Sequence, residues 1–82
     1  MNITIYSTSS CATCHVVTDW LDKHKMAYTK KNTDEDSAAM MEFMNVNDGF
    51  VGVPFTVITT DDGQTTKIPG FDQKKLKQAL GI

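Results

Sequence analysis

The sequence has no long apolar run, no strong excess of either charge and only two cysteines. No stretch comes near the ~20 apolar residues that a membrane-spanning helix requires, so we expect no membrane span. Ten acidic and eight basic residues give a formal net charge of −2, and there is no Lys/Arg run. This balance argues against binding to nucleic acid. The first residues, Met-Asn-Ile-Thr-Ile-Tyr, have neither the basic segment nor the apolar core of a signal peptide, so we expect a cytoplasmic protein.

What the sequence does contain is enough apolar material for one folded domain. It has 82 residues, of which 40% are apolar, a proportion typical of globular proteins and not of disordered chains. A chain of this length supports one modest core, so we predict a single domain over residues 1–82 and expect a monomer. In a cytoplasmic chain, a closely spaced cysteine pair is more often redox-active or metal-binding than a structural disulfide.

Alternating β-branched residues and apolar residues at helical spacing predict seven elements in the order β-α-β-α-β-β-α. The predicted strands are residues 2–7, 27–32, 55–60 and 65–68, and the predicted helices are residues 12–25, 35–45 and 73–80. The strand–helix–strand start favours a parallel pair with a right-handed crossover, and Asp61-Asp62-Gly63 predicts a hairpin turn. The fold class is therefore α/β, a mixed four-stranded sheet with helices on both faces, which is the layout of thioredoxin-like proteins.

Short polar segments are predicted to cap the helices. Ser7-Thr8-Ser9-Ser10 offers hydroxyl groups to the first helix. Asn32-Thr33-Asp34 precedes the second helix, whose first turn is expected to contain Glu35 and Asp36. Asp72 is the candidate cap of the last helix.

Apolar side chains of the second helix are expected to face the core. Ala38, Met41 and Met44 are predicted to point inward, and the methionines at 26, 40, 41 and 44 are expected to fill the core. The apolar stretch Phe50–Val53 is expected to be exposed and to contact protein partners.

Cys11-Ala-Thr-Cys14 follows the first predicted strand and opens the first predicted helix, which is a pattern typical of redox proteins. Unpaired N–H groups and the dipole at a helix N-terminus stabilise an anion. Such sites lower the pKa of a thiol from about 8.5 toward about 3.5–7.5. Cys14 is one helical turn further on and can close a short disulfide. We therefore expect Cys11 to attack a substrate disulfide and Cys14 to resolve the mixed disulfide.

Three other roles for the cysteines are open at this point. They could be buried thiols in a redox-inert interaction module, or half of a zinc site completed by His15 and His24. Cys11-Ala-Thr-Cys14-His15 also matches the haem-attachment pattern. The sequence has no second cysteine pair, however, and no methionine after Met44 to serve as an axial ligand. We therefore expect no bound metal and an exposed His15.

Four segments together point to a known family. They are Ile3-Thr4-Ile5-Tyr6, Cys11-Ala-Thr-Cys14, Gly52-Val53-Pro54-Phe55 and Gly70-Phe71-Asp72. In these segments the chain resembles the glutaredoxin family over essentially its whole length. The resemblance implies dithiol–disulfide oxidoreductase activity, no bound cofactor, a cis peptide bond before Pro54 and substrate contact by the backbone of Val53. It also implies substrate contacts from Gly70, Phe71 and Asp72, although for Asp72 a role as helix cap alone is the favoured interpretation.

Within that family the chain is similar to the NrdH-type redoxins, which reduce ribonucleotide reductase and are recharged by thioredoxin reductase at the expense of NADPH. Glutathione-dependent glutaredoxins typically carry Pro-Tyr between the cysteines, a basic residue shortly before them and a Gly-Gly-Asp segment before the last helix. Here Ala12-Thr13, Thr8 and Gly70-Phe71 stand at those places. Because glutathione carries two carboxylates, the loss of a nearby cation weakens its binding. The NrdH-type Trp-Ser-Gly-Phe-Arg-Pro-Asp segment is also absent, so glutathione as the reductant is the alternative.

Overall fold

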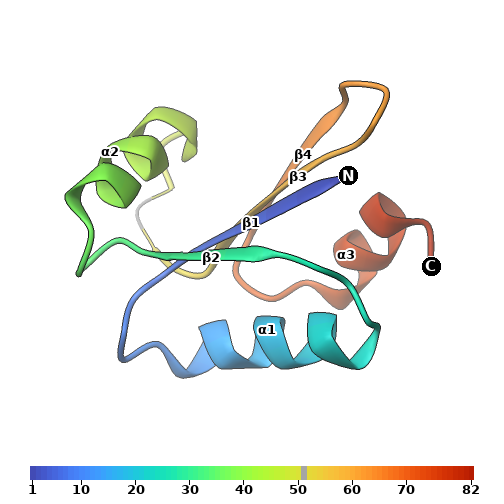
Figure 1. Ribbon diagram of the computed structural model, residues 1–82, viewed down its shortest axis with the longest axis horizontal. Coiled ribbons are helices and arrows are strands. Elements are labelled where there is room, and N and C mark those ends of the chain that lie inside the picture. The colour runs from blue at the N-terminus through green and yellow to red at the C-terminus, as the bar shows by residue number, and fades with distance from the viewer. Residues whose placement is uncertain (51) are drawn as a thin grey trace.

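The computed structural model describes residues 1–50 and 52–82. Its elements are β1 (Asn2–Ser7), α1 (Ala12–Lys23), β2 (Thr29–Asn32), α2 (Ser37–Val46), β3 (Phe55–Thr59), β4 (Thr65–Pro69) and α3 (Gln73–Leu80). The strands form one sheet in the order β2-β1-β3-β4, in which β1 and β2 are parallel and the other neighbours antiparallel. α1 and α3 lie on one face of the sheet and α2 lies on the other (Figure 1). The predicted thioredoxin-like α/β fold is confirmed.

The larger core lies between the sheet and the helices α1 and α3. Its buried members are Ile3, Ile5, Val17, Leu21, Ile58, Ile68, Leu76 and Leu80. Side chains alternate between the two faces of a strand, so Ile3 and Ile5 of β1 point to this face together. Trp20 and Met26 are partly buried and pack against the same core.

The smaller core lies under α2 and is made of three aromatic side chains. Phe43 of α2 packs between Tyr6 of β1 and Phe55 of β3, with ring centroids 5.7 and 5.6 Å away. All three residues are buried. Edge-to-face and tilted aromatic pairs of this kind add to the stabilisation from burial.

Two ion pairs hold α2 and the turn after it against the outer strands of the sheet. Lys31 of β2 lies 2.6 Å from the carboxylate of Glu42 in α2. On the opposite side, Lys67 of β4 lies 3.1 Å from the carboxylate of Asp48, just after α2. The hydrogen bond to Glu42 raises the pKa of Lys31 above its usual value. These pairs stand on both flanks of the aromatic core, one from each edge strand.

The predicted element boundaries need small corrections. α1 ends at Lys23 because Lys25 takes a left-handed φ of 57° and Met26 N–H turns back to bond the carbonyl of Leu21. β2 is shorter than predicted and begins at Thr29, the first residue paired with β1.

The start of α2 is also later than predicted. The helix begins at Ser37, and its cap is Asp36, whose carboxylate accepts from the N–H of Ala38 at 2.9 Å. The prediction that Asn32-Thr33-Asp34 caps α2 was therefore wrong. Glu35 and Asp36 do not lie in the first turn of the helix. The reason is that the three polar residues are bonded to the end of β1 and to the loop after it.

The predicted inward face of α2 was wrong. Met41 and Met44 are 69% and 67% exposed, and Ala38 is exposed, whereas Ala39 and Phe43 face the sheet. α2 is apolar on several sides, so the side with the large aromatic residue faces the sheet and the methionines face outward. Although α2 has exposed methionines, neither it nor any other described helix is long and apolar enough to cross a membrane.

Candidate active site

The segments singled out from the sequence come together at one edge of the sheet. The parallel strands β1 and β2 end there at the paired residues Ser7 and Asn32. β3 begins and β4 ends at the same edge, because Phe55 pairs with both Tyr6 and Pro69. The loops that carry the cysteines, the Val-Pro pair and the Gly-Phe-Asp segment therefore leave the sheet together. In open α/β sheets, functional sites form where loops leave the carboxyl ends of parallel strands.

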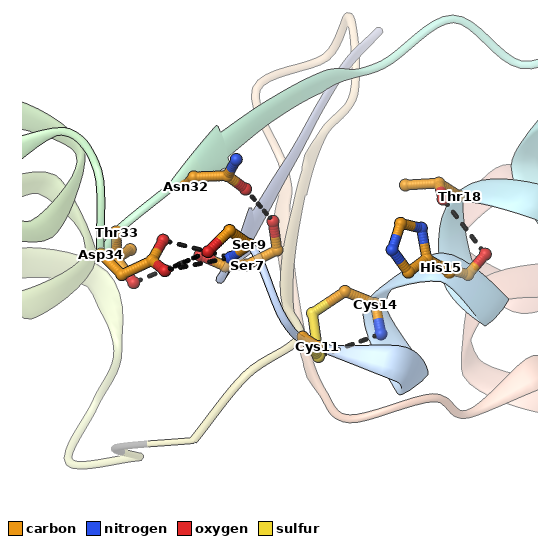
Figure 2. Close-up of a disulfide and its surroundings, with 9 residues drawn as sticks. All are labelled: Ser7, Ser9, Cys11, Cys14, His15, Thr18, Asn32, Thr33 and Asp34. Atoms are coloured by element: carbon orange, nitrogen blue, oxygen red, sulfur yellow. Dashed lines mark hydrogen bonds between the residues drawn. A yellow bond between two sulfur atoms is a disulfide. The ribbon is translucent and has the colours of Figure 1, made fainter.

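Cys11 and Cys14 form a disulfide at the start of α1 (Figure 2). Their Cα atoms are 5.3 Å apart, a separation that suits a disulfide. The two residues differ in exposure, because Cys11 is half-buried whereas Cys14 is 0% exposed. When reduced, this arrangement can present one sulfur to a substrate while shielding the other.

Cys11 is itself the N-cap of α1. Its backbone is extended, with φ −85° and ψ 108°, and its Sγ accepts from the backbone N–H of Cys14 at 3.1 Å. The serine-rich segment that was predicted to cap the helix does not do so. A sulfur that already accepts from a free N–H of the first turn is placed to be stabilised as a thiolate.

A polar network joins the loop before Cys11 to the segment after β2 (Figure 2). The buried Thr33 donates to the carbonyl of Ser7 through its N–H at 2.8 Å and its hydroxyl at 3.2 Å. The hydroxyl of Ser7 donates to Oδ1 of Asn32 at 2.7 Å, and Nδ2 of Asn32 donates to Glu35 at 2.7 Å. These bonds cross from β1 to the connection between β2 and α2.

Asp34 extends this network to the turn that leads to Cys11. Its two carboxylate oxygens both accept from the N–H of Ser9 at 3.2 Å, and one also accepts from the Ser9 hydroxyl at 2.6 Å. These donors stabilise the ionised carboxylate. The hydrogen bond from the Ser9 hydroxyl, followed by that from its N–H, lowers the pKa of Asp34 below its usual value.

The Val-Pro and Gly-Phe segments are joined directly. The Val53–Pro54 peptide bond is cis, as the resemblance implied. The N–H of Gly70 donates to the carbonyl of Pro54 at 2.8 Å, and Gly70 has a φ of 70°, in the left-handed region that glycine adopts without strain. Two of the segments predicted to contact substrate are thus adjacent.

Asp72 and Phe71 have clear structural roles. The Asp72 carboxylate accepts from the N–H of Lys75 at 3.1 Å, which makes it the N-cap of α3. Phe71 is partly buried and packs against the larger core. The predicted cap is confirmed, and the substrate contacts of both residues stay a prediction.

The predicted exposed loop is described only in part. Phe50 is 38% exposed and stacks on Phe55 with ring centroids 5.9 Å apart. Gly52 and Val53 are half-buried. The prediction for Val51 lies outside the described residues.

Sequence reasoning missed the roles of Ser7, Ser9, Asn32, Thr33 and Asp34. A signal for them was present, since polar residues follow two strands predicted to be neighbouring and parallel. Because the carboxyl ends of such strands meet at one edge of the sheet, the polar segments that follow β1 and β2 are expected to lie next to each other.

His15 is exposed on α1, as predicted. Within residues 1–50 and 52–82, no group of three or more His, Cys, Asp or Glu side chains is placed to hold a metal ion.

Comparison with known proteins gives a family and a set of similar structures. The glutaredoxin family model matches residues 3–62, which is most of the chain. A mutant of the thioredoxin-like protein BC3987 is 30% identical, with a TM-score of 0.81 over 99% of this chain and 96% of its own. The glutaredoxin-like NrdH-redoxin from Escherichia coli is 23% identical, with a TM-score of 0.75 over 95% of this chain and 93% of its own. A glutaredoxin from Archaeoglobus fulgidus is 18% identical, with a TM-score of 0.75 over 96% and 85%. At these lower identities the likeness shows the shared fold. No curated protein matches the chain.

Proposed function

The chain belongs to the glutaredoxin family of thiol–disulfide oxidoreductases, and we propose that it reduces protein disulfides through Cys11 and Cys14. The observation that carries this proposal is the asymmetry of the pair. Cys11 caps α1, accepts from the N–H of Cys14 and is half-buried, whereas the Cys14 sulfur is buried. The reaction requires one accessible thiolate to attack the substrate and a second thiol close enough to resolve the mixed disulfide.

The reaction has two exchanges. The thiolate of Cys11 attacks one sulfur of the substrate disulfide, whose S–S bond breaks, and the departing substrate sulfur takes up a proton. Cys14 then loses its proton, and its thiolate attacks Sγ of Cys11, which breaks the mixed disulfide and releases the second substrate sulfur as a thiol. Two electrons pass to the substrate, and the protein is left with the Cys11–Cys14 disulfide.

The backbone of Val53 next to cis Pro54 positions the substrate in this proposal, with Gly70 and Phe71 beside them. The bond from Gly70 N–H to the Pro54 carbonyl supports this grouping. Asp72 contributes by capping α3 behind Phe71.

The electron donor in this proposal is thioredoxin reductase, and the acceptor is ribonucleotide reductase, with the protein acting as a monomer in the cytoplasm. Two observations support this assignment. No Lys or Arg precedes Lys23 in the sequence, so the loop before the cysteines offers no cation to the carboxylates of glutathione. The similar NrdH-redoxin from Escherichia coli is described as a glutaredoxin-like protein with a thioredoxin-like activity profile.

The experiment that tests the electron donor follows NADPH consumption by the oxidised protein. One reaction contains thioredoxin reductase, and the other contains glutathione and glutathione reductase. We expect turnover with thioredoxin reductase alone, after which ribonucleotide reductase is the first acceptor to assay. Turnover with glutathione alone would make this chain a glutathione-dependent glutaredoxin and would contradict the assignment.

A further inference from the structure

Hydrogen bonds connect the residues of the turn between β1 and α1 to one another and to the segment after β2. The N–H of Cys11 donates to the carbonyl of Thr8 at 3.3 Å, which closes a turn with Ser9 and Ser10 at its tip. Ser9 and Ser10 are exposed, and Thr8 is half-buried. The position of Cys11 therefore depends on what fixes this turn.

Asp34 is the residue that fixes the tip of the turn. It engages Ser9 through three hydrogen bonds, at 3.2, 3.2 and 2.6 Å, that join residues 25 positions apart in the chain. Hydrogen bonds to an ionised carboxylate are stronger than bonds between neutral groups. Asp34 is itself anchored, because the neighbouring Thr33 is buried and bonds the carbonyl of Ser7 twice.

We propose that Ser9 and Asp34 are positioning residues for the nucleophile, holding the turn that places the Cys11 sulfur at the N-terminus of α1. The 3.1 Å bond from Cys14 N–H to the Cys11 sulfur requires the extended backbone that Cys11 now has. If the turn moves, the sulfur loses this donor, and a thiolate that loses a hydrogen bond becomes less stable. The inference rests on the proposed role of Cys11 as the nucleophile.

The direction in which Asp34→Ala changes the reactivity of Cys11 distinguishes a positioning role from a purely electrostatic one. Asp34 carries a negative charge, and removing a negative charge near a thiolate favours the thiolate. A pure charge effect of Asp34→Ala therefore makes Cys11 more reactive at low pH. Loss of the positioning contact makes Cys11 less reactive.

The experiment measures the alkylation rate of Cys11 by iodoacetamide against pH. All proteins carry Cys14→Ser, so that a single thiol reacts, and far-ultraviolet circular dichroism checks that each is folded. The test variants are Asp34→Ala, Asp34→Asn and Ser9→Ala. Two variants serve as controls. Ser9→Thr keeps the hydroxyl group. Asp48→Asn removes one carboxylate charge at the end of α2 opposite to Asp34, and asparagine tolerates the left-handed φ of 52° at that position. All of these proteins keep His15, the titratable residue next to position 14, so a difference between their alkylation profiles does not come from a change at His15.

We expect Asp34→Ala to raise the midpoint of the alkylation profile by about 0.5–1 pH unit, which lowers the rate below the midpoint about three- to ten-fold. Asp34→Asn changes the midpoint less, and so does Ser9→Ala, which keeps the backbone N–H bonds. Ser9→Thr and Asp48→Asn match the parent. An unchanged or lowered midpoint for Asp34→Ala, or an equal shift for Asp48→Asn, would overturn the positioning role.

The alkylation midpoint of the Cys14→Ser parent distinguishes failure of the proposed function from failure of the positioning role. If its own midpoint lies at the ordinary thiol value of about 8.5, Cys11 is not activated, and both the proposed nucleophile and the positioning role fail. If the parent midpoint is well below that value and the Asp34→Ala midpoint equals it, the inference alone fails and the proposed function stands.

Discussion

Cys11 and Cys14 are three positions apart but have different surroundings. Cys11 is half-buried at the cap of α1, and Cys14 is buried beneath it. We therefore expect Cys11→Ser to abolish the reduction of a protein disulfide, because no accessible thiolate is left to attack. We expect Cys14→Ser to accumulate a mixed disulfide with the substrate, which mass spectrometry detects. Full activity of Cys11→Ser would rule out the proposed mechanism.

A second prediction at the residue scale concerns Asp34 and acid. Its pKa lies below the usual 3.8 because of the donors on Ser9. A carboxylate with a depressed pKa in the folded state stabilises the protein above its usual pKa, and this contribution is lost as the pH falls through the lowered value. We expect wild type to exceed Asp34→Asn in Tm by a constant amount at neutral pH. The difference should close only below pH 3.8. Thermal unfolding from neutral to acid pH measures it, and a difference that closes above pH 5 would contradict the account.

At the scale of elements, α3 depends on its cap. The Asp72 carboxylate accepts from Lys75 N–H, and Gly81 ends the helix with a left-handed φ of 72°. Loss of such a cap costs about 0.5–2 kcal/mol. We expect this loss for Asp72→Ala in urea unfolding and only a small change for Asp72→Ser, which keeps a capping oxygen. If Asp72→Ser kept stability but lost most activity toward protein disulfides, Asp72 would contact substrate as well.

α2 provides the clearest contrast between buried and exposed apolar residues on one helix. Phe43 is 4% exposed and contacts Tyr6 and Phe55, whereas Met44 is 67% exposed. Phe43→Ala is expected to lower the free energy of unfolding by about 3–5 kcal/mol. Met44→Ala is expected to change it by no more than about 0.5 kcal/mol. Chemical unfolding of both variants measures this, and equal losses would mean that Met44 is covered in solution.

On the scale of the whole molecule, the two faces of the sheet carry cores of unequal size. The face under α1 and α3 holds the larger core, and the face under α2 holds three aromatic residues and is flanked by ion pairs. α1, whose N-cap is Cys11, begins at the edge where the parallel strands β1 and β2 end.

The hydroxyl group of Thr56 is buried on the face of the sheet that carries the larger core. Thr56 is 0% exposed, pairs with Ile5 and Ile68, and its hydroxyl has no hydrogen-bond partner within residues 1–50 and 52–82. A buried polar group without a partner costs about 1–3 kcal/mol. We therefore expect Thr56→Val, which has nearly the same shape, to raise Tm without altering Cys11 reactivity, as measured by thermal unfolding and alkylation. A lower Tm would show that the hydroxyl has a partner in solution.

The sequence by itself determined the order of the elements, the redox pair at the first strand–helix junction and the family. These depend on local patterns, such as the alternation in β1, the Asp-Gly hairpin turn and two cysteines one helical turn apart. The last cap also followed from the sequence, because Asp72 bonds an N–H only three residues away.

Only the tertiary structure decided which side of α2 is buried and which residue bonds the tip of the turn before Cys11. Periodicity could not choose the buried side of α2, because the helix is apolar on several sides and its orientation depends on Tyr6 and Phe55 from two strands. The bond between Ser9 and Asp34 joins residues that local spacing does not relate. It forms because the parallel register of β1 and β2 brings their carboxyl ends to the same edge of the sheet.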